Sequence, residues 1–270
     1  MKRIAAFPTI LTLSNAFCGF LAIGYVMRAE RSVPEKFGHN MEMAGWMVLL
    51  ALVFDALDGK IARLMKSETD FGVQLDSLAD VISFGVAPGF MCMAMVAERG
   101  FLARLGWAAS SLFMICALLR LARYNVETQN NSEGSMYFTG LPAPAGAGLV
   151  ASLVMMRYHI EIAASEEFGW VPRRLFPMMD ALAKYLPFLA LALALLMVSR
   201  VRYVHVVNKW FGDQEPFGYV VLLILVGFFF FFTRPFSIPL AFLIYIAAGL
   251  AGGFRETRRE NNGAAQKTPQ

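Results

Sequence analysis

Charged residues are scarce in this chain of 270 residues, and their scarcity argues against a soluble domain. Asp, Glu, Lys and Arg together make up 16% of the sequence, whereas apolar residues make up 57%. Soluble domains typically carry about 25% charged residues. The composition therefore predicts an integral membrane protein.

Cysteine and histidine are also rare, with three residues of each. Cys18, Cys92 and Cys116 lie inside apolar runs with unrelated spacing, which excludes a disulfide framework and a cysteine-based metal site. The formal net charge is only +4, and the basic residues gather at the ends of apolar runs, where they act as topology signals and headgroup contacts. We therefore expect a lipid bilayer around the chain and no nucleic-acid partner.

Long apolar runs are what the sequence has in abundance. A helix needs about 20 residues to cross the hydrocarbon core of a membrane, and eight runs reach or approach that length. They are expected at about 9–27, 43–63, 73–96, 101–121, 142–156, 185–199, 217–232 and 236–254. The sequence thus predicts an all-α fold, a polytopic membrane bundle of about eight transmembrane helices.

The apolar runs and the polar stretches between them divide the chain into three parts. Residues 1–157 contain the first five runs and every motif discussed below, residues 158–254 contain the remaining predicted helices, and residues 255–270 form a polar tail that we expect to be disordered. An exposed loop or an interfacial segment is predicted over 157–180, where Pro and polar residues interrupt the apolar pattern. Eight spans place both termini on one side of the membrane, and a slight excess of Lys and Arg there favours the cytoplasm.

Four aspartates lie in or beside two neighbouring predicted spans. Asp55 and Asp58 are spaced i,i+3, and Asp76 and Asp80 are spaced i,i+4, so each pair shares one face of a helix. An ionised Asp near the middle of a membrane costs roughly 2.5 to 3.5 kcal/mol on insertion scales, and too few basic side chains lie nearby to neutralise all four. A ligand set of oxygens without His or Cys suits Mg²⁺ or Mn²⁺ better than Zn²⁺.

Three other interpretations of these acids are weaker. Helix caps or ion pairs with neighbouring basic residues do not need four acids at these spacings inside apolar runs. A calcium-binding EF-hand loop would require Glu at its twelfth position, where this chain has Lys66. A cation transporter or channel is the alternative from another functional class, but it needs no Gly-x2-Ala-Arg spacing between the acid pairs, and no inverted repeat is visible.

The segment 55–80 fits the pattern D-x2-D-G-x2-A-R-x8-G-x3-D-x3-D without a gap. It resembles the signature of the CDP-alcohol phosphotransferases, membrane enzymes that displace CMP from a CDP-linked lipid with an alcohol. The resemblance implies two divalent cations, Mg²⁺ or Mn²⁺, held by Asp55, Asp58, Asp76 and Asp80. It also assigns Asp80 as the catalytic base that takes the proton of the acceptor hydroxyl. Two cations at such a site can clamp the pyrophosphate during an in-line displacement.

The same resemblance implies a set of contacts to the CDP-lipid. Gly59 and Gly72 each weaken a helix by about 1 kcal/mol. Glycine at these positions is understandable if the backbone must lie close to a nucleotide. Near the N-terminus, P-T-x2-T-x2-N resembles the family's P-N-x2-T type motif beside the nucleotide, with Thr9 at the usual Asn position. The alternative for these polar side chains is a bond to helix carbonyls or to neighbouring helices. The residues expected to contact the CDP-lipid are Gly59, Ala62, Arg63, Thr69, Gly72, Thr12 and Asn15.

Three further motifs narrow the choice of acceptor alcohol. LDSLADVISFGVAPG (75–89), RLARYN (120–125) and FTGLPAP (138–144) resemble the membrane-spanning phosphatidylserine synthases of bacteria and archaea. This resemblance, which covers about residues 8–146, implies transfer of the phosphatidyl group from CDP-diacylglycerol to L-serine. It also implies a homodimer in the bacterial inner membrane, with the active site on the cytoplasmic side.

Serine is a small zwitterion, so its pocket needs a cation for the carboxylate and an acceptor for the ammonium group. Two arginines at the end of the fourth span suit the first task, although both can equally be topology anchors. The residues expected in the serine pocket are Arg120, Arg123, Asn125, Ser83 and Pro88. Glycerol 3-phosphate and inositol phosphate are the alternative acceptors, but these anions require a denser cationic pocket than two arginines provide.

Overall fold

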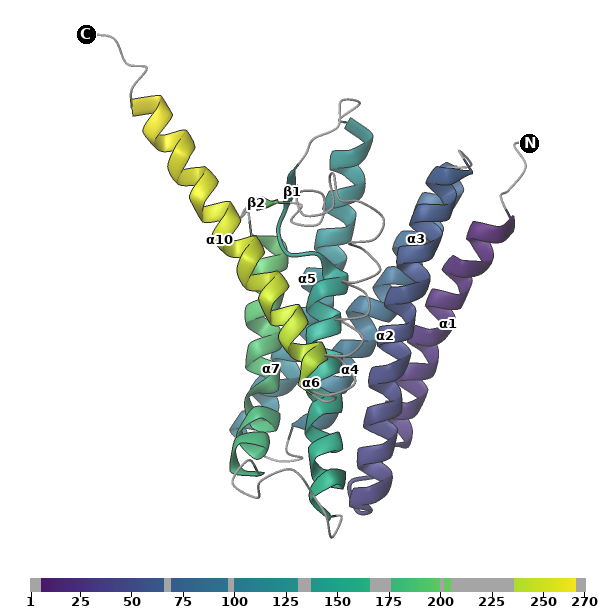
Figure 1. Cartoon of the computed structure of the whole chain (residues 1–270). Helices are drawn as coiled ribbons and strands as arrows, with labels where there is room; N and C mark the ends of the chain where they lie inside the picture. The colour runs from purple at the N-terminus through teal and green to yellow at the C-terminus, as the bar shows by residue number, and fades with distance from the viewer. Residues whose placement is uncertain are drawn as a thin grey trace, which may run out of the picture.

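The computed structural model describes residues 6–65, 69–96, 100–130, 137–165, 176–199, 202–204 and 236–265. The chain forms a bundle of long helices (Figure 1). In chain order the helices are α1 (Ala6–Arg28), α2 (Pro34–Leu64), α3 (Asp70–Asp80), the π-helical segment η1 (Val81–Val86), α4 (Ala87–Met95), α5 (Phe101–Asn130), α6 (Ala143–Ser165), α7 (Phe176–Val198) and α10 (Ser237–Ala265). Because α3, η1 and α4 follow one another without a break, the described part of the chain contains seven continuous helices.

Four of these helices are long and apolar enough to cross a membrane, and they confirm the first four predicted spans. They cover Phe7–Arg28, Pro34–Ala62, Asp70–Met95 and Ala103–Glu127. Shorter apolar stretches lie in α7 and α10, at Lys184–Val198 and Ser237–Gly253. The seventh predicted span, 217–232, lies outside the described residues. The prediction of a helical membrane bundle is therefore confirmed, and the prediction of eight spans is not.

Several helices extend beyond the apolar runs that predicted them. α6 continues to Ser165 and α7 begins at Phe176, so both ends of the segment 157–180, predicted to be an exposed loop or an interfacial segment, are helical. α10 continues to Ala265, which corrects the prediction of a disordered tail as far as that residue. The apolar run measures the part of a helix that lipid can cover, whereas Arg, Glu and Gln are good helix formers in water as well.

A short β-ribbon, which the sequence analysis did not predict, lies at one end of the bundle. β1 (Tyr137–Thr139) pairs antiparallel with β2 (Arg202–Val204), with Phe138 opposite Tyr203. Gly140 follows β1 with a φ of +85°, and a Cβ at this position would lie 2.2 Å from the carbonyl oxygen of Met197. Only glycine therefore lets the chain turn here, past the end of α7 and into α6.

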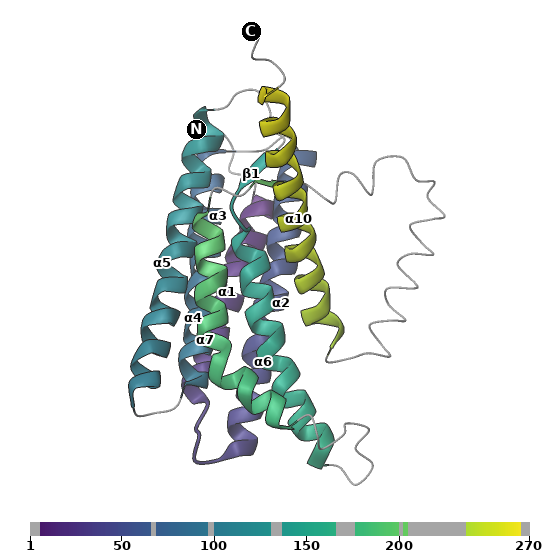
Figure 2. The ribbon, with the colours of Figure 1, turned by 90° about the vertical axis from the view of Figure 1, so that its left-hand side faces the viewer.

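α6 is the central helix of the core. It packs against α2, α7 and α10, and Figure 2 shows α7 between α5 and α6, with α10 beside α6. Its first turns, APAGAGLVAS, consist largely of small residues, and almost all of them are buried. A Cβ on Gly148 would lie 2.2 Å from the ring of Phe242 on α10. Small residues at these positions let the neighbouring helices approach closely.

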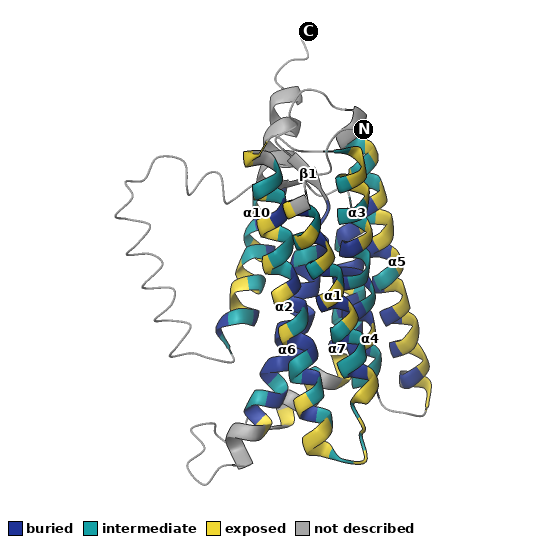
Figure 3. Ribbon diagram, turned by 90° about the vertical axis from the view of Figure 1, so that its right-hand side faces the viewer, coloured by how far each residue is buried: buried dark blue, intermediate teal, exposed yellow. Residues whose placement is uncertain are grey.

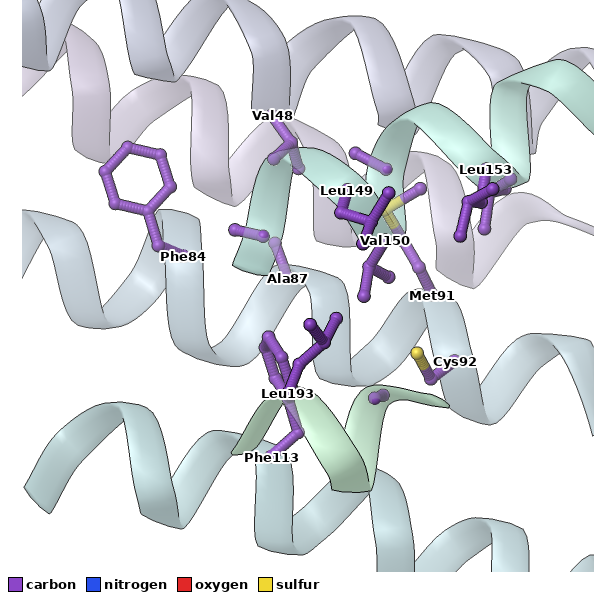
Figure 4. Packing of buried hydrophobic residues seen from close by; sticks show 14 of the residues in the cluster. Val48, Phe84, Ala87, Met91, Cys92, Phe113, Leu149, Val150, Leu153 and Leu193 are labelled. Carbon is purple, nitrogen blue, oxygen red and sulfur yellow. The ribbon is translucent and has the colours of Figure 1, made fainter. Parts of the chain in front are cut away.

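Larger apolar side chains fill the space between the helices. In Figure 4, Phe84, Met91, Leu149, Phe113 and Leu193 extend from several helices into one cluster. Exposed positions lie on the outward faces of the bundle, as Figure 3 shows along α5. The start of α1 and the end of α10 lie at the same end of the bundle (Figure 1).

The π-helical segment η1 lies directly after Asp80, and Ser83, Phe84 and Gly85 within it are buried. Pro88 follows in the first turn of α4. In a regular α-helix the ring of Pro88 would clash with the carbonyl of Phe84, four residues earlier. Proline also has no backbone N–H to donate a hydrogen bond to that carbonyl. A wider turn before the proline avoids that conflict, and such π segments are frequent at functional sites.

Candidate metal centre

Three of the four aspartates converge between α2 and α3. One carboxylate oxygen from each of Asp55, Asp76 and Asp80 lies within 4.8 Å of the other two. At 1.5 Å per residue, Asp55 lies about 14 Å before the end of α2, and Asp76 and Asp80 lie about 9 and 15 Å after the start of α3. The short connection between the two helices therefore brings all three to a similar depth. α1 packs against both α2 and α3 and holds them together.

The donor set of this centre fits a hard divalent cation. Oδ1 of Asp76 is buried and has no hydrogen-bond partner among the described residues. A buried carboxylate oxygen without a partner costs free energy unless a donor or a cation reaches it. Carboxylate oxygens are the preferred ligands of Mg²⁺ and Mn²⁺. Asp55, Asp76 and Asp80 can therefore hold a divalent cation, and the predicted set of four aspartate ligands for two cations stays a prediction.

Asp58, the fourth predicted ligand, does not belong to the three-carboxylate group. Its side chain is 4% exposed, and its Oδ2 lies 2.9 Å from Oγ1 of Thr12 on α1. The same hydroxyl lies 3.1 Å from the carbonyl oxygen of Pro8, so it shares its single proton between two acceptors. Asp58 thus adjoins the centre through the helix turn that also carries Asp55, and its partner in this structure is a neutral donor.

Asp80 also has a donor from α1. Nδ2 of Asn15 lies 3.0 Å from Oδ1 of Asp80, and Asn15 is fully buried, with an exposed fraction of 0%. Thr12 and Asn15 are spaced i,i+3 and so share the face of α1 that meets the acids. Contact of these two residues with cytidine stays a prediction, whereas their contact with carboxylates is a structural observation.

The predicted CDP-lipid contacts on α2 and α3 surround the same acids. Gly59 follows Asp58, and a Cβ at this position would meet nothing within 4 Å, so the backbone there borders open space. Thr69 is the N-cap of α3, and its Oγ1 accepts a hydrogen bond of 3.1 Å from the backbone N–H of Gly72. Ala62 is half-buried on α2, and Arg63 continues that helix.

Arg120 lies near enough to the acids for its charge to interact with them. It lies on α5, its guanidinium interacts electrostatically with Asp80 and Asp55, and its charged carbon lies 5.6 Å from the ring centre of Tyr124. The phenol of Tyr245 on α10 also interacts electrostatically with Arg120. Arg120 therefore brings a positive charge to the wall of the centre, and its predicted place in a serine pocket stays a prediction.

The other residues predicted for the serine pocket already have partners within the protein. Nε of Arg123 donates to Glu127 one turn later, at 2.7 Å, and its side chain is 37% exposed. Nδ2 of Asn125 donates to Oγ of Ser77 at 2.8 Å. Ser83 is fully buried, and its hydroxyl donates to the backbone carbonyl of Asn15 at 2.8 Å. Pro88 is buried at the start of α4.

Membrane-length helices around an acidic centre define a polytopic membrane protein with a candidate site for divalent cations. The model of the CDP-alcohol phosphatidyltransferase family matches residues 5–198, a range that includes all four aspartates. The chain belongs to this family. The resemblance of segment 55–80 is thereby confirmed, and the chain is an integral membrane protein.

The relatives of the chain have related names. It is 33% identical over 248 residues to the CDP-diacylglycerol–serine O-phosphatidyltransferase of Helicobacter pylori strain 26695, covering 90% of this chain and 89% of the relative. It is 38% identical over 158 residues to the protein of the same name from Saccharomyces cerevisiae, covering 57% and 55%. The archaetidylserine synthase of Methanothermobacter thermautotrophicus is 31% identical over 208 residues, with coverage of 75% and 72%.

The sequence analysis left one contribution to the centre open and missed another. Bonds from Thr12 and Asn15 to a helix carbonyl or to neighbouring helices were its alternative to a nucleotide contact, and the structure shows such bonds, to Pro8, Asp58 and Asp80. Tyr245 was missed because it lies outside residues 8–146, which the resemblance covers, and a lone Tyr in an apolar run gives no signal.

Proposed function

We propose that the protein transfers the phosphatidyl group of CDP-diacylglycerol to L-serine, giving phosphatidylserine and CMP. The observation that carries the proposal is the convergence of Asp55, Asp76 and Asp80 inside a membrane bundle, with Arg120 beside them. The names of the relatives from Helicobacter pylori and Saccharomyces cerevisiae support serine as the acceptor. The serine-like motifs at 75–89, 120–125 and 138–144 support it independently.

In the proposed reaction the acceptor is the serine hydroxyl. Its oxygen forms a bond to the phosphorus that carries the diacylglycerol, and the bond from that phosphorus to the bridging pyrophosphate oxygen breaks. CMP leaves with the electron pair of the broken bond, and Asp80 takes the proton of the hydroxyl. Bound divalent cations would be held by Asp55, Asp58, Asp76 and Asp80 and would neutralise the charge of the phosphate oxygens.

The remaining polar residues around the centre are assigned by their positions. The open space beside Gly59 admits the CDP moiety. The other contacts to the CDP-lipid come from the end of α2 and the start of α3, at Ala62, Arg63, Thr69 and Gly72. Arg120 pairs with the carboxylate of serine, because its side chain brings a positive charge to the wall of the centre. Serine then lies between Arg120 and Asp80 with its hydroxyl close to the base.

The membrane placement follows from the same proposal. We infer that the protein lies in a bacterial inner membrane and that its acidic centre opens toward the cytoplasm. Serine and CMP are both dissolved on that side. The start of α1 and the end of α10 share one end of the bundle, which supports placing both termini on that side. The homodimer implied by the family resemblance stays a prediction.

An acceptor panel tests the reaction and the alcohol together. Protein purified in detergent is incubated with CDP-diacylglycerol, Mn²⁺ and one acceptor at a time, and CMP release is measured. We expect release with L-serine, no release after chelation with EDTA, and recovery when Mn²⁺ is returned. Asp76→Asn serves as the site-directed negative control. CMP release with glycerol 3-phosphate or inositol phosphate but not with serine would refute the assignment of serine.

A further inference from the structure

α1 supplies one neutral donor to each pair of aspartates. Thr12 donates to Asp58, the second acid of the first pair, and Asn15 donates to Asp80, the second acid of the second pair. In the described part of the chain, Thr12 and Asn15 make no hydrogen bond to Asp55 or Asp76, the first acid of each pair, and Oδ1 of Asp76 has no hydrogen-bond partner there. In each pair, therefore, the second acid accepts a hydrogen bond from Thr12 or Asn15 and the first acid does not.

The Asn15 amide cannot be reached from outside the protein in this structure. Its exposed fraction is 0%, and Asp80 beside it is 7% exposed. A ligand needs access to at least part of a side chain in order to contact it, so the burial of Asn15 favours a role toward the protein over a role toward the nucleotide. A hydrogen bond to a carboxylate fixes the orientation of that carboxylate, as outer partners commonly do at metal centres.

Ser83 fixes Asn15 in turn. The Ser83 hydroxyl donates to the backbone carbonyl of Asn15 at 2.8 Å, a carbonyl in the middle of α1. This contact requires close approach of the two helices, because a Cβ on Gly19 would lie 2.5 Å from Oγ and 2.8 Å from Cα of Ser83. Asn15 therefore binds residue 80 with its side chain and residue 83 with its backbone, across the junction of α3 and η1.

We propose that Asn15 is a positioning residue for Asp80, and that Ser83 supports it through the Asn15 carbonyl. The proposal rests on the proposed function for the role of Asp80 as base, and it assigns Ser83 to the frame of the centre rather than to the serine pocket. Asn15 holds one oxygen of the Asp80 carboxylate, so that the other oxygen keeps a fixed direction toward the centre. Neither Asn15 nor Ser83 contacts a substrate.

The kinetic test uses Asn15→Ala, Ser83→Ala and the double variant. Removal of an outer partner of a metal centre typically costs about 10- to 100-fold in activity or metal affinity. We expect Asn15→Ala to lower kcat by about that factor, with the KM for CDP-diacylglycerol changed by less than about threefold. Ser83→Ala should lower kcat less, and the double variant should be no worse than Asn15→Ala, because Ser83 acts through Asn15.

Ser110→Ala is the matched control. Ser110 is also buried, and its hydroxyl also donates to a helix carbonyl, that of Gly106 at 2.9 Å, but within α5 and away from the acids. The Ser110→Ala variant should therefore have the same kcat as the unaltered protein. Equal losses in Ser110→Ala and Ser83→Ala would overturn the role of Ser83. An unchanged kcat in Asn15→Ala with a KM for CDP-diacylglycerol raised about tenfold or more would indicate contact with the nucleotide and overturn the role of Asn15.

A second measurement separates this inference from the choice of substrate. Mn²⁺ is titrated into each purified variant, and the free ion is followed by electron paramagnetic resonance. Asn15→Ala should bind Mn²⁺ about tenfold more weakly than the unaltered protein, and Ser110→Ala should bind it equally well. Equal binding by Asn15→Ala and the unaltered protein would refute the positioning role. If the unaltered protein released no CMP with serine, the proposed function would fail while the Mn²⁺ result still tested Asn15.

Discussion

Asn125 on α5 donates a hydrogen bond of 2.8 Å to Oγ of Ser77, the residue directly after Asp76. The same Ser77 hydroxyl donates to the carbonyl of Val73 at 3.0 Å, so it accepts from one helix while it donates within its own. Through this pair α5, which carries Arg120, is tied to the helix that carries two of the acids. The helix that carries Arg120 and the helix that carries Asp76 and Asp80 are thus connected by a hydrogen bond between two neutral side chains.

A double-mutant cycle tests the Asn125–Ser77 link. A neutral hydrogen bond contributes about 0.5 to 1.5 kcal/mol, so Asn125→Ala and Ser77→Ala should each lower the melting temperature in detergent by about 1 to 6 °C. The double variant should melt close to the single variants, because both remove the same bond. Ser111→Ala is the control, since its hydroxyl bonds only within α5, to the carbonyl of Trp107. Additive losses would show that the two residues stabilise the fold separately.

Substitutions of Asp58 and Asp80, the two acids that accept hydrogen bonds from α1, should differ in their effect on catalysis. Asp80→Asn keeps the size of the side chain but removes the base, so turnover should collapse while CDP-diacylglycerol binding is largely retained. Asp58→Ala removes a predicted cation ligand and leaves the Thr12 hydroxyl with the Pro8 carbonyl alone, so lipid binding should be lost as well. Binding of labelled CDP-diacylglycerol and CMP release are measured side by side. Equal, mild effects of both changes would contradict this division of labour.

Arg120 and Arg123 should be separable by their effects on serine. Arg120 interacts with Asp80 and Asp55, so Arg120→Met should raise the KM for serine at least tenfold, given that a charge-assisted hydrogen bond contributes about 1.5 to 3 kcal/mol. Arg123→Met is the matched control, because Arg123 pairs with Glu127 and is partly exposed. It should change the KM by less than about threefold, as exposed ion pairs contribute little. Equal increases would assign both arginines to the pocket.

Two glycines of α1 allow a direct comparison of helix contact and helix propensity. Gly19→Ala would place a Cβ 2.8 Å from the Cα of Ser83, whereas Gly24→Ala would meet nothing within 4 Å. We expect Gly19→Ala to separate α1 from η1 and to lower both thermal stability and CMP release. Gly24→Ala should leave activity intact and stabilise α1 by up to about 1 kcal/mol. A Gly19→Ala variant that behaves like Gly24→Ala would refute the close approach.

The sequence predicted the acids of the centre well, because their geometry is local. Spacings of three and four residues on two consecutive helices dictate which carboxylates share a face, and a short connection dictates that the faces meet. The same reasoning could not separate Asp58 from Asp55, since both lie on one face of α2. That difference comes from Thr12, a residue 46 positions away from Asp58, whose partner depends on how α1 packs.

The parts of the fold that the sequence did not predict depend on contacts distant in the chain. The pairing of residues 137–139 with 202–204 joins segments that carry no strand pattern of their own. The π-helical turn at Val81–Val86 looks like any apolar run when only hydrophobicity is considered. Pro88, which was expected in the serine pocket, follows this turn directly, and its role in a pocket stays a prediction. The helix ends were misplaced because lipid-facing length and helical length are different quantities.

The contact between Phe242 and Gly148 has a consequence for the extent of a working protein. The family match ends at residue 198, yet α10 inserts an aromatic ring where α6 has no side chain and brings the phenol of Tyr245 to Arg120. A chain shortened to the matched region would retain Asp55, Asp58, Asp76 and Asp80 and yet uncover the first turns of α6 at Gly148. α10 therefore belongs to the packed core of the bundle, and shortened versions of this protein should be designed to include it.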